Sequence, residues 1–267
     1  MSKAKTAAGG SIYRIQVLER TFGILQALAD DGSDVSLAEL AGRLGLHKST
    51  THRLLMVLEA DHFVEKCAGS GKYHLGSRLI DLGRAALARI DVFELARPHL
   101  RALTAETGET AHLAVLRGGE VVSVVNAESR QTVRTPATVG TRSPAHCTSL
   151  GKAILASLPP EQLDEFLRRH VMEAHTRKTI TSSSRFRAEL RAIRDRGYAV
   201  DNEELEEGLR CIGAPVQDHT GAVIAAVSIA GPAYRIRIDR VPTLAIPVVR
   251  TAGRISESLG YRPQVTD

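Results

Sequence analysis

The stretch LGLHKSTTHRLLMVLEADHFV, residues 44–64, has the pattern of a tight turn, a helix and the start of a strand. Its apolar residues recur at helical spacing and predict one buried stripe: Thr51, Leu54, Leu55 and Leu58. Residues 40–58 contain no Asp or Glu, so Arg43, Lys48 and Arg53 are expected to lack a partner. The opposite face of this helix is therefore either an ordinary solvated surface or a surface that binds something negative.

The elements on either side of this stretch complete a winged helix-turn-helix. Ser36-Leu37-Ala38-Glu39 is a capping box that opens the preceding helix, and Gly45 ends that helix in the left-handed conformation. After the third helix, residues 63–66 and 72–75 read as two strands joined by a Gly-Ser-Gly turn. The order of these elements predicts a winged helix-turn-helix over residues 12–76, after a flexible tail at residues 1–11.

The polar face of the third helix suits the major groove of DNA. A reading helix needs short polar side chains near its N-terminus, with cations beside them for the phosphates. The candidate DNA-binding residues are His47, Lys48, Ser49, Thr50, His52 and Arg53 on the helix and Lys72 on the wing. The partner predicted for this face is double-stranded DNA, and a solvated surface is the alternative.

Composition sets further bounds. The 267 residues carry a net charge of +5 with a pI near 9.3, which permits a nucleic-acid partner without proving one. The three cysteines form no Cys-x-x-Cys pair, so no metal site, no catalytic site and no cofactor is predicted. The sparse thiols and the lack of a long apolar run predict a cytoplasmic protein with no membrane partner.

The rest of the chain predicts a linker helix and a second domain. We expect the linker at residues 77–91, with Pro98 bending or restarting the helix that follows it. Gly118-Gly119 and residues 218–221 read as the turns of two hairpins. Because these hairpins alternate with helices, residues 92–264 are expected to form an α+β domain on an antiparallel sheet.

Segments in both predicted domains resemble one known family. SLAELAGRLGLHKSTTHRLLMVLEADHFVEK is similar to the winged helix-turn-helix of the IclR family of bacterial transcription regulators. VGTRSPAHCTSLGKAILA and DNEELEEGLRCIGAPVQDHTGAVIAAVSIAGP are similar to the signature stretches of that family's effector-binding domain. The likeness implies a DNA-binding domain, a linker helix that helps dimerise, a GAF-like sensor domain, and dimers that often pair into tetramers.

The resemblance places effector-binding positions at Gly140, Asp201, Cys211 and Ser228. Thr148 or Ser149 can cap the helix that follows, and the free amides at such a helix start favour a carboxylate. Many family members read Ser-Ile-Ser-Gly-Pro, where this chain has Ser228-Ile229-Ala230-Gly231-Pro232. The missing hydroxyl favours a less polar effector, such as an aromatic acid.

These observations predict a regulator that binds a roughly palindromic operator as a homodimer or tetramer and senses a small carboxylate. The alternatives are an enzyme that uses the second domain's pocket and a redox sensor that uses Cys147 or Cys211. His146 and Cys147 are expected on a strand, where neighbours point to opposite faces. The acidic run at residues 203–207 is expected to be a solvated loop or a pocket lid.

Overall fold

The computed structural model describes residues 15–87, 91–136 and 138–262, and the chain divides into two units, Met1–Arg89 and Ile90–Asp267. The predicted tail at residues 1–11 and residues 88–90 of the predicted linker lie outside the described residues. No described helix has the length and apolar content that crossing a bilayer requires. Each unit is described by itself.

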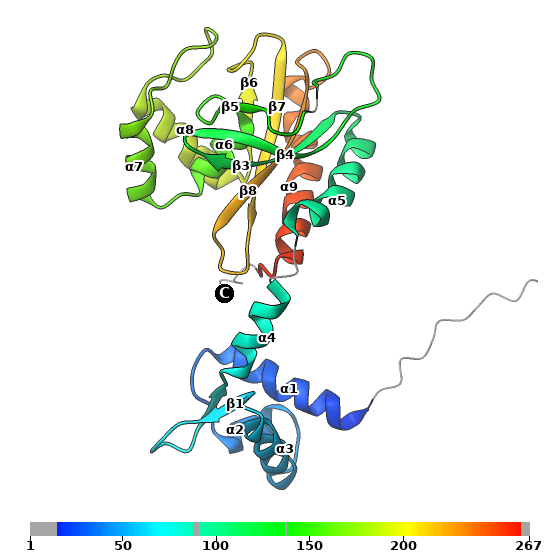
Figure 1. Ribbon diagram of the computed structural model, residues 1–267, viewed down its shortest axis with the longest axis vertical. Helices are drawn as coiled ribbons and strands as arrows, with labels where there is room; N and C mark the ends of the chain where they lie inside the picture. The colour runs from blue at the N-terminus through cyan, green and yellow to red at the C-terminus, as the bar shows by residue number, and fades with distance from the viewer. Residues whose placement is uncertain (1–14, 88–90, 137, 263–267) are drawn as a thin grey trace, which may run out of the picture. The chain divides into compact units, whose positions relative to one another are not determined.

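The N-terminal unit is a winged helix-turn-helix followed by one more helix (Figure 1). Its elements are α1 (Gln16–Asp31), α2 (Leu37–Arg43), α3 (Lys48–Ala60), β1 (Val64–Lys66), β2 (Tyr73–Leu75) and α4 (Arg78–Leu87). The capping box is confirmed, because Ser36 Oγ accepts from the Glu39 amide at 3.3 Å and the Glu39 carboxylate accepts from the Ser36 amide at 2.8 Å. Gly45 adopts φ +61°, as the turn between α2 and α3 requires.

One apolar cluster holds this unit together. Ile24, Leu40 and Leu55 are fully buried where α1, α2 and α3 meet. The predicted stripe of α3 faces this cluster, since Thr51 and Leu58 are also buried. The opposite face of α3 is left exposed, which makes it available to a partner.

The C-terminal unit is an α+β domain, as predicted. Its helices are α5 (Val92–Thr107), α6 (Ser149–Ala156), α7 (Pro160–Arg169), α8 (Ser183–Arg196), the 3-10 helix η1 (Ile238–Arg240) and α9 (Val241–Ser258). Its strands are β3 (Thr110–Arg117), β4 (Glu120–Ala127), β5 (Arg142–Pro144), β6 (Ala199–Asn202), β7 (Leu209–Gln217) and β8 (Val223–Pro232).

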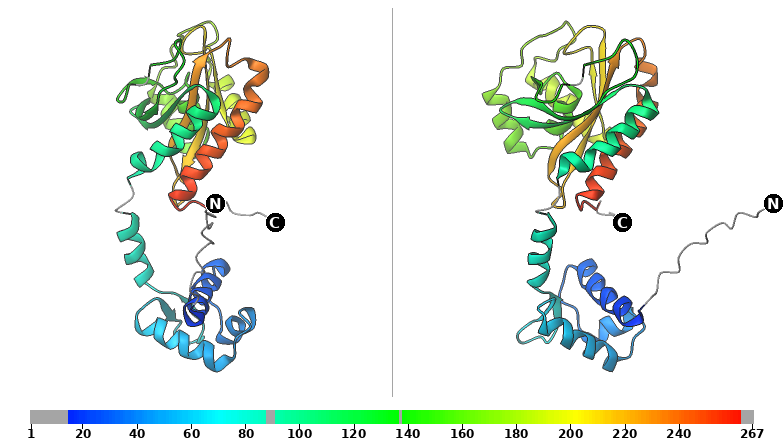
Figure 2. Two further views of the ribbon diagram at one scale, coloured as in Figure 1. Left: turned by 90° about the vertical axis from the view of Figure 1, so that its right-hand side faces the viewer. Right: turned by 45° about the vertical axis from the view of Figure 1, so that its right-hand side comes forward.

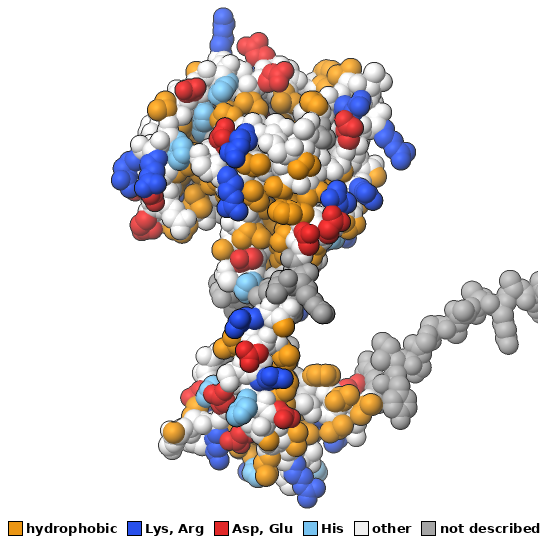
Figure 3. Space-filling model, in the orientation of Figure 1, with side chains coloured by type: hydrophobic (Ala, Val, Ile, Leu, Met, Phe, Trp, Pro, Cys, Tyr) orange, Lys and Arg blue, Asp and Glu red, His pale blue; other side chains and the backbone are white. Residues whose placement is uncertain are grey.

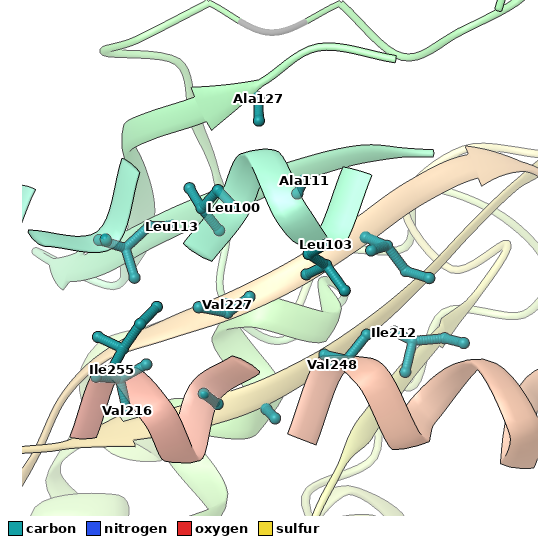
Figure 4. Close-up of a cluster of buried hydrophobic side chains, with 14 of the residues drawn as sticks. Leu100, Leu103, Ala111, Leu113, Ala127, Ile212, Val216, Val227, Val248 and Ile255 are labelled. Carbon is teal, nitrogen blue, oxygen red and sulfur yellow. The ribbon is translucent and has the colours of Figure 1, made fainter. Parts of the chain in front are cut away.

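The six strands form one antiparallel sheet in the order β5-β4-β3-β8-β7-β6. The pair β3–β8 joins the two predicted hairpins, so the centre of the sheet is built from segments far apart in the chain. Helices α5 and α9 lie side by side over one face (Figures 1 and 2). Their apolar side chains, with Leu100, Leu103, Val248 and Ile255 among them, form the larger core against the sheet (Figure 4).

The other face of the sheet carries α6 and α8. Their buried side chains pack with those of α7 in a second apolar cluster, which contains Leu155, Phe166, Phe186 and Leu190. The start of α6 lies against the middle of the sheet because α6 packs on β7 and β8. This placement brings the first turn of α6 to the residues that the sequence marked for effector binding.

One feature of the connection differs from the prediction. Pro98 lies inside α5 without ending it, and the helix begins six residues earlier, at Val92. Asp91 is the cap, since its carboxylate accepts from the amides of Phe93 and Glu94 at 2.9 and 3.3 Å. Of the two alternatives expected for Pro98, a bend or a restart, the restart is therefore wrong.

Candidate functional site

The exposed face of α3 gathers six of the seven residues predicted to bind DNA. His47 is the N-cap residue, and Lys48, Ser49, His52 and Arg53 are exposed in the first two turns, with Thr50 half-buried beside them. Figure 3 shows Lys or Arg side chains projecting at the lower end of this unit, where Figure 1 draws α3. The seventh, Lys72, is exposed on the wing immediately before β2.

The N-terminus of α3 is suited to a phosphate. No side chain caps this helix, and its first turn contains no acidic residue. The first amides of a helix have no partner within it, and the helix dipole adds positive potential at that end. A phosphate oxygen placed there would accept from backbone amides while Lys48 and Arg53 supply charge nearby.

The charge on this surface is smaller than the sequence suggested. Arg43 forms an ion pair with Asp31 at 3.3 Å, so the expectation that it lacks a partner was wrong. The partner comes from the end of α1, outside the acid-free segment. Among the residues that the structure describes, Lys48 and Arg53 have no carboxylate within ion-pair distance, so both positive charges remain uncompensated on this face of α3.

The C-terminal unit contains a cavity of about 130 Å³ between the sheet and the first turn of α6. Thr148, Asp201, Cys211 and Ser228 all line it, so the structure brings together four of the five predicted effector-binding residues. Most of its polar lining consists of hydroxyl side chains: Ser123, Thr135, Thr138, Thr141, Ser143, Thr148, Ser149 and Ser228. None of the described lining residues is Lys or Arg. A larger surface cleft of about 620 Å³ beside α5 contains none of the predicted residues.

Gly140, the fifth predicted residue, does not line this cavity. It adopts φ +90°, and its amide donates to the carbonyl of Ser123 at 2.8 Å. Its neighbours Thr138 and Thr141 do line the cavity. Gly140 therefore shapes the loop that carries lining residues.

The first turn of α6 is fixed closely against the sheet. Thr148 is the N-cap, and its hydroxyl accepts from the Gly151 amide at 3.1 Å and donates to the Pro144 carbonyl at 3.0 Å. A Cβ at Gly151 would lie 2.1 Å from the Ala145 carbonyl oxygen, so only glycine fits there. Because the Thr148 hydroxyl is already engaged, the amides that follow it are the better donors for an anion.

Asp201 places an acid in the cavity wall. One carboxylate oxygen accepts from the amides of Glu204 and Leu205 at 2.8 and 3.4 Å, and the other is buried without a partner. Burial raises the pKa of Asp201 to about 7. Near neutral pH this side chain can therefore either donate a proton to a ligand or accept one from it.

A buried ion pair lies beside Asp201. Lys152 of α6 is 1% exposed and pairs with Glu204, with Glu189 at 3.8 Å. Burial raises the pKa of Glu204. The acidic run was expected to be a solvated loop or a pocket lid. The solvated alternative is wrong for Glu204, which is 5% exposed and pairs with Lys152 in the interior. Leu205 beside it lines the cavity, so this loop forms part of the wall.

His112 is a lining residue that the sequence did not reveal. It lies on β3 opposite Ser228 of β8, and its Nδ1 is 2.9 Å from the amide oxygen of Asn126. Its Nε2 is buried without a partner, and burial lowers its pKa. The neutral ring therefore offers a hydrogen-bond acceptor at Nε2 when Nδ1 carries the proton. The only local signal was a His within a predicted strand.

Both cysteines of this unit are buried thiols. Burial raises the pKa of Cys147 to about 12 and that of Cys211 well above its ordinary value. Thiols held in the protonated form react slowly with oxidants, which argues against the redox alternative. His146 and Cys147 lie in a turn and not on a strand, and their ligand atoms lie within 4.8 Å of one another and of His175. The expectation that they point apart was wrong.

The first unit is a winged helix-turn-helix with an exposed reading face, and the second unit contains a small polar cavity. Together these features are typical of ligand-responsive DNA-binding regulators. Residues 17–67 match the IclR helix-turn-helix domain, and residues 84–257 match the bacterial transcriptional regulator IclR C-terminal domain. The chain belongs to the IclR family of bacterial transcriptional regulators, and it is not an enzyme.

Relatives and solved structures agree over nearly the whole chain. The HTH-type transcriptional repressor AllR of Klebsiella pneumoniae is 37% identical over 249 residues, 93% of this chain and 92% of its own length. The HTH-type transcriptional regulator BhcR of Paracoccus denitrificans is 37% identical, over 93% of this chain and 88% of its own. The crystal structure of the Agobacterium tumefaciens repressor BlcR has a TM-score of 0.78 at 30% identity, covering 93% of this chain and 99% of that one.

Proposed function

We propose that this regulator binds a roughly palindromic operator through α3 and the wing, and that a small carboxylate in the cavity alters that binding. The observation that carries the proposal is the cavity itself, because four predicted effector residues and the first turn of α6 all line it. The DNA contacts proposed are His47, Lys48, Ser49, Thr50, His52, Arg53 and Lys72. The effector contacts proposed are Thr148, Asp201, Cys211 and Ser228, with Gly140 shaping the loop.

The size of the cavity supports a small ligand. An engineered cavity of ~150 Å³ in another protein holds benzene, so about 130 Å³ is matched to a single ring or a short acid. Ala114, Val121, Leu150 and Ala230 give part of the lining an apolar character that suits an aromatic body. A related solved structure is the inducer-binding domain of a double mutant of PobR from Acinetobacter in complex with 3-hydroxybenzoic acid, which matches 61% of this chain at 30% identity and a TM-score of 0.57.

The lining supports recognition of a carboxylate without a cation. The described lining contains no Lys or Arg, so an anion would be bound by the amides at the start of α6 and by surrounding hydroxyls. Protonated Asp201 would add one donor. The ligand changes operator affinity to the extent that it favours one conformation of the regulator over another.

A palindromic operator implies a dimer. Two reading helices would enter successive major-groove faces ~34 Å apart, which one chain cannot supply. We infer a homodimer that can pair into a tetramer and that acts in the cytoplasm, where the DNA is.

The test couples DNA binding to ligand binding. Operator sequences are selected from random duplexes by the full-length protein, and affinity is then followed by fluorescence anisotropy with benzoates and short 2-oxo acids added. We expect a member of one class to shift operator affinity and to raise the melting temperature of the protein. Ser228→Ala should weaken the ligand response and leave ligand-free DNA binding unchanged. A response that is the same in Ser228→Ala places the effector elsewhere.

A further inference from the structure

Three potential metal ligands lie together in the N-terminal unit, away from the reading face of α3. They are Asp34 before α2, Cys67 after β1 and His74 in β2. Cys67 Sγ is 3.2 Å from His74 Nδ1, and Asp34 Oδ1 is 3.8 Å from the same nitrogen. All three ligand atoms lie within 4.8 Å of one another.

The backbone holds these three residues in place. Val35 and Tyr73 exchange two hydrogen bonds of 2.9 and 2.8 Å, which fixes Asp34 beside the strand that carries His74. The Cys67 amide donates to the Lys72 carbonyl at 2.8 Å across the base of the wing turn. His74 and Cys67 are thus held by backbone hydrogen bonds of the hairpin, and Asp34 is next to Val35, which is held in the same way. The backbone positions of the three potential ligands are therefore fixed before an ion binds.

The distances fit one tetrahedral ion. With Zn–S of ~2.3 Å and Zn–N or Zn–O of ~2.1 Å, tetrahedral geometry separates neighbouring ligand atoms by about 3.4–3.6 Å. The observed 3.2 and 3.8 Å bracket that range, and the third pair, Cys67 Sγ and the Asp34 carboxylate, lies within 4.8 Å, so small side-chain shifts are sufficient. Thiolate, imidazole and carboxylate are all ligands that zinc uses.

A second carboxylate supports the imidazole from behind. Glu65 faces His74 across the hairpin, and its Oε2 is 3.8 Å from His74 Nε2. A carboxylate at the far nitrogen of a ligating histidine orients the ring and increases its basicity. The side chains of Asp34, Glu65 and His74 are each 42–49% exposed, so an ion and a water can reach the cluster from solvent.

We propose that the wing binds a zinc-type divalent cation through Asp34, Cys67 and His74, with a water molecule as the fourth ligand. On binding, Cys67 releases its proton to solvent and ligates as the thiolate, while His74 ligates through Nδ1. The ion joins the segment before α2 to both strands of the hairpin. Since Lys72 lies in that hairpin, metal binding would fix the position of a proposed DNA contact.

No motif spacing predicts this site, because its ligands come from three separate segments of the chain. The cluster at His146, Cys147 and His175 is a weaker candidate, because Cys147 is fully buried, whereas Cys67 is only half-buried. The two clusters lie in different units and share no residue. Each can therefore serve as the control for the other.

Cobalt titration of the full-length protein, freed of metal by a chelator, tests the proposal. We expect one equivalent of Co²⁺ to produce a thiolate charge-transfer band in the near ultraviolet and visible bands typical of tetrahedral cobalt, with Zn²⁺ displacing both. Cys67→Ser should abolish the charge-transfer band and Cys147→Ser should retain it. Glu65→Gln, which replaces the carboxylate with a neutral amide, should weaken metal affinity by ~10–100-fold, because His74 loses the negative charge that increases its basicity.

A charge-transfer band that persists in Cys67→Ser, or is lost only in Cys147→Ser, overturns the proposal, as does the absence of any band in the wild-type chain. Circular dichroism checks that each variant is folded, and Asp34→Asn gives a second variant in which weaker metal binding is expected. These measurements need no DNA. A failure of the metal site is therefore distinguishable from a failure of the proposed DNA binding, which is tested separately by repeating the operator titration with and without Zn²⁺.

Discussion

Replacing Asp201 with Asn is expected to stabilise the C-terminal unit, and to do so more at pH 8 than at pH 5. The carboxyl has an ordinary pKa of 3.8 and a pKa of about 7 in the folded protein, because burial disfavours its charged form. The folded state therefore binds this proton more tightly than the unfolded state does. Stability from this group is greatest below pH 3.8 and is lost as the pH rises toward 7.

The difference between the two pKa values of Asp201, 3.8 and about 7, sets the size of the change in the free energy of unfolding. At ~1.4 kcal/mol per pH unit, ionising Asp201 in the folded state costs about 4 kcal/mol once the pH exceeds 7. Between pH 5 and pH 8 the wild-type chain should lose roughly 2–3 kcal/mol that Asp201→Asn does not lose. Asn keeps the oxygen that accepts from the amides of Glu204 and Leu205, so the local hydrogen bonds survive the substitution.

The assay is urea unfolding of both proteins at pH 5 and pH 8, followed by circular dichroism, with hydrogen exchange to separate the two units. Other buried groups titrate in both proteins, so the difference between the two isolates Asp201. Glu207→Gln is the control, since it neutralises an exposed carboxylate on the same loop. If Asp201→Asn is equally stabilising at both pH values, the pKa of Asp201 is not raised by burial, which refutes the prediction.

Three further outcomes are expected. Arg53→Ala should weaken specific operator binding by ~1–3 kcal/mol if Arg53 contacts a base, while Arg43→Ala, which removes an ion-paired residue, should change operator binding far less. Equal losses for the two variants in footprinting titrations would contradict the proposed DNA-binding surface. Gly151→Ala should destabilise the C-terminal unit by ~1–3 kcal/mol or more through backbone overlap, whereas Gly253→Ala, in open space on α9, should be neutral or slightly stabilising in thermal melts. A carboxylate effector should bind more tightly as the pH falls through 7, by at most ~10-fold per pH unit, because protonated Asp201 can donate to it and ionised Asp201 repels it; calorimetry that finds tighter binding at pH 8 than at pH 6 would refute this.

The local features of the fold were predictable from the sequence. The capping box at Ser36, the left-handed Gly45 and the hairpin at Gly118-Gly119 each depend on residues close together in the chain, and all are present in the structure. Asp91 illustrates the limit of this approach. A proline is a conspicuous signal for a helix break, yet α5 tolerates Pro98 and the cap that begins the helix is one ordinary aspartate.

The cavity was predictable only in part. The family likeness pointed to Asp201, Cys211 and Ser228, but His112 reaches the cavity because β3 pairs with β8, more than a hundred residues later. No local pattern encodes that pairing. The same reason explains Glu204, whose burial depends on a lysine in a different helix.

The pairing of Lys152 with Glu204 has a consequence for how this protein can diverge. Losing either residue alone would strand a charge in the interior, at a cost of ~3–5 kcal/mol, whereas replacing both with apolar residues of similar volume would be tolerated or even favourable. A single substitution at either position is therefore selected against, and the two residues should be conserved together or replaced together. Because Glu204 neighbours Leu205 of the cavity wall, ligand preference in descendants of this chain would evolve around that fixed pair.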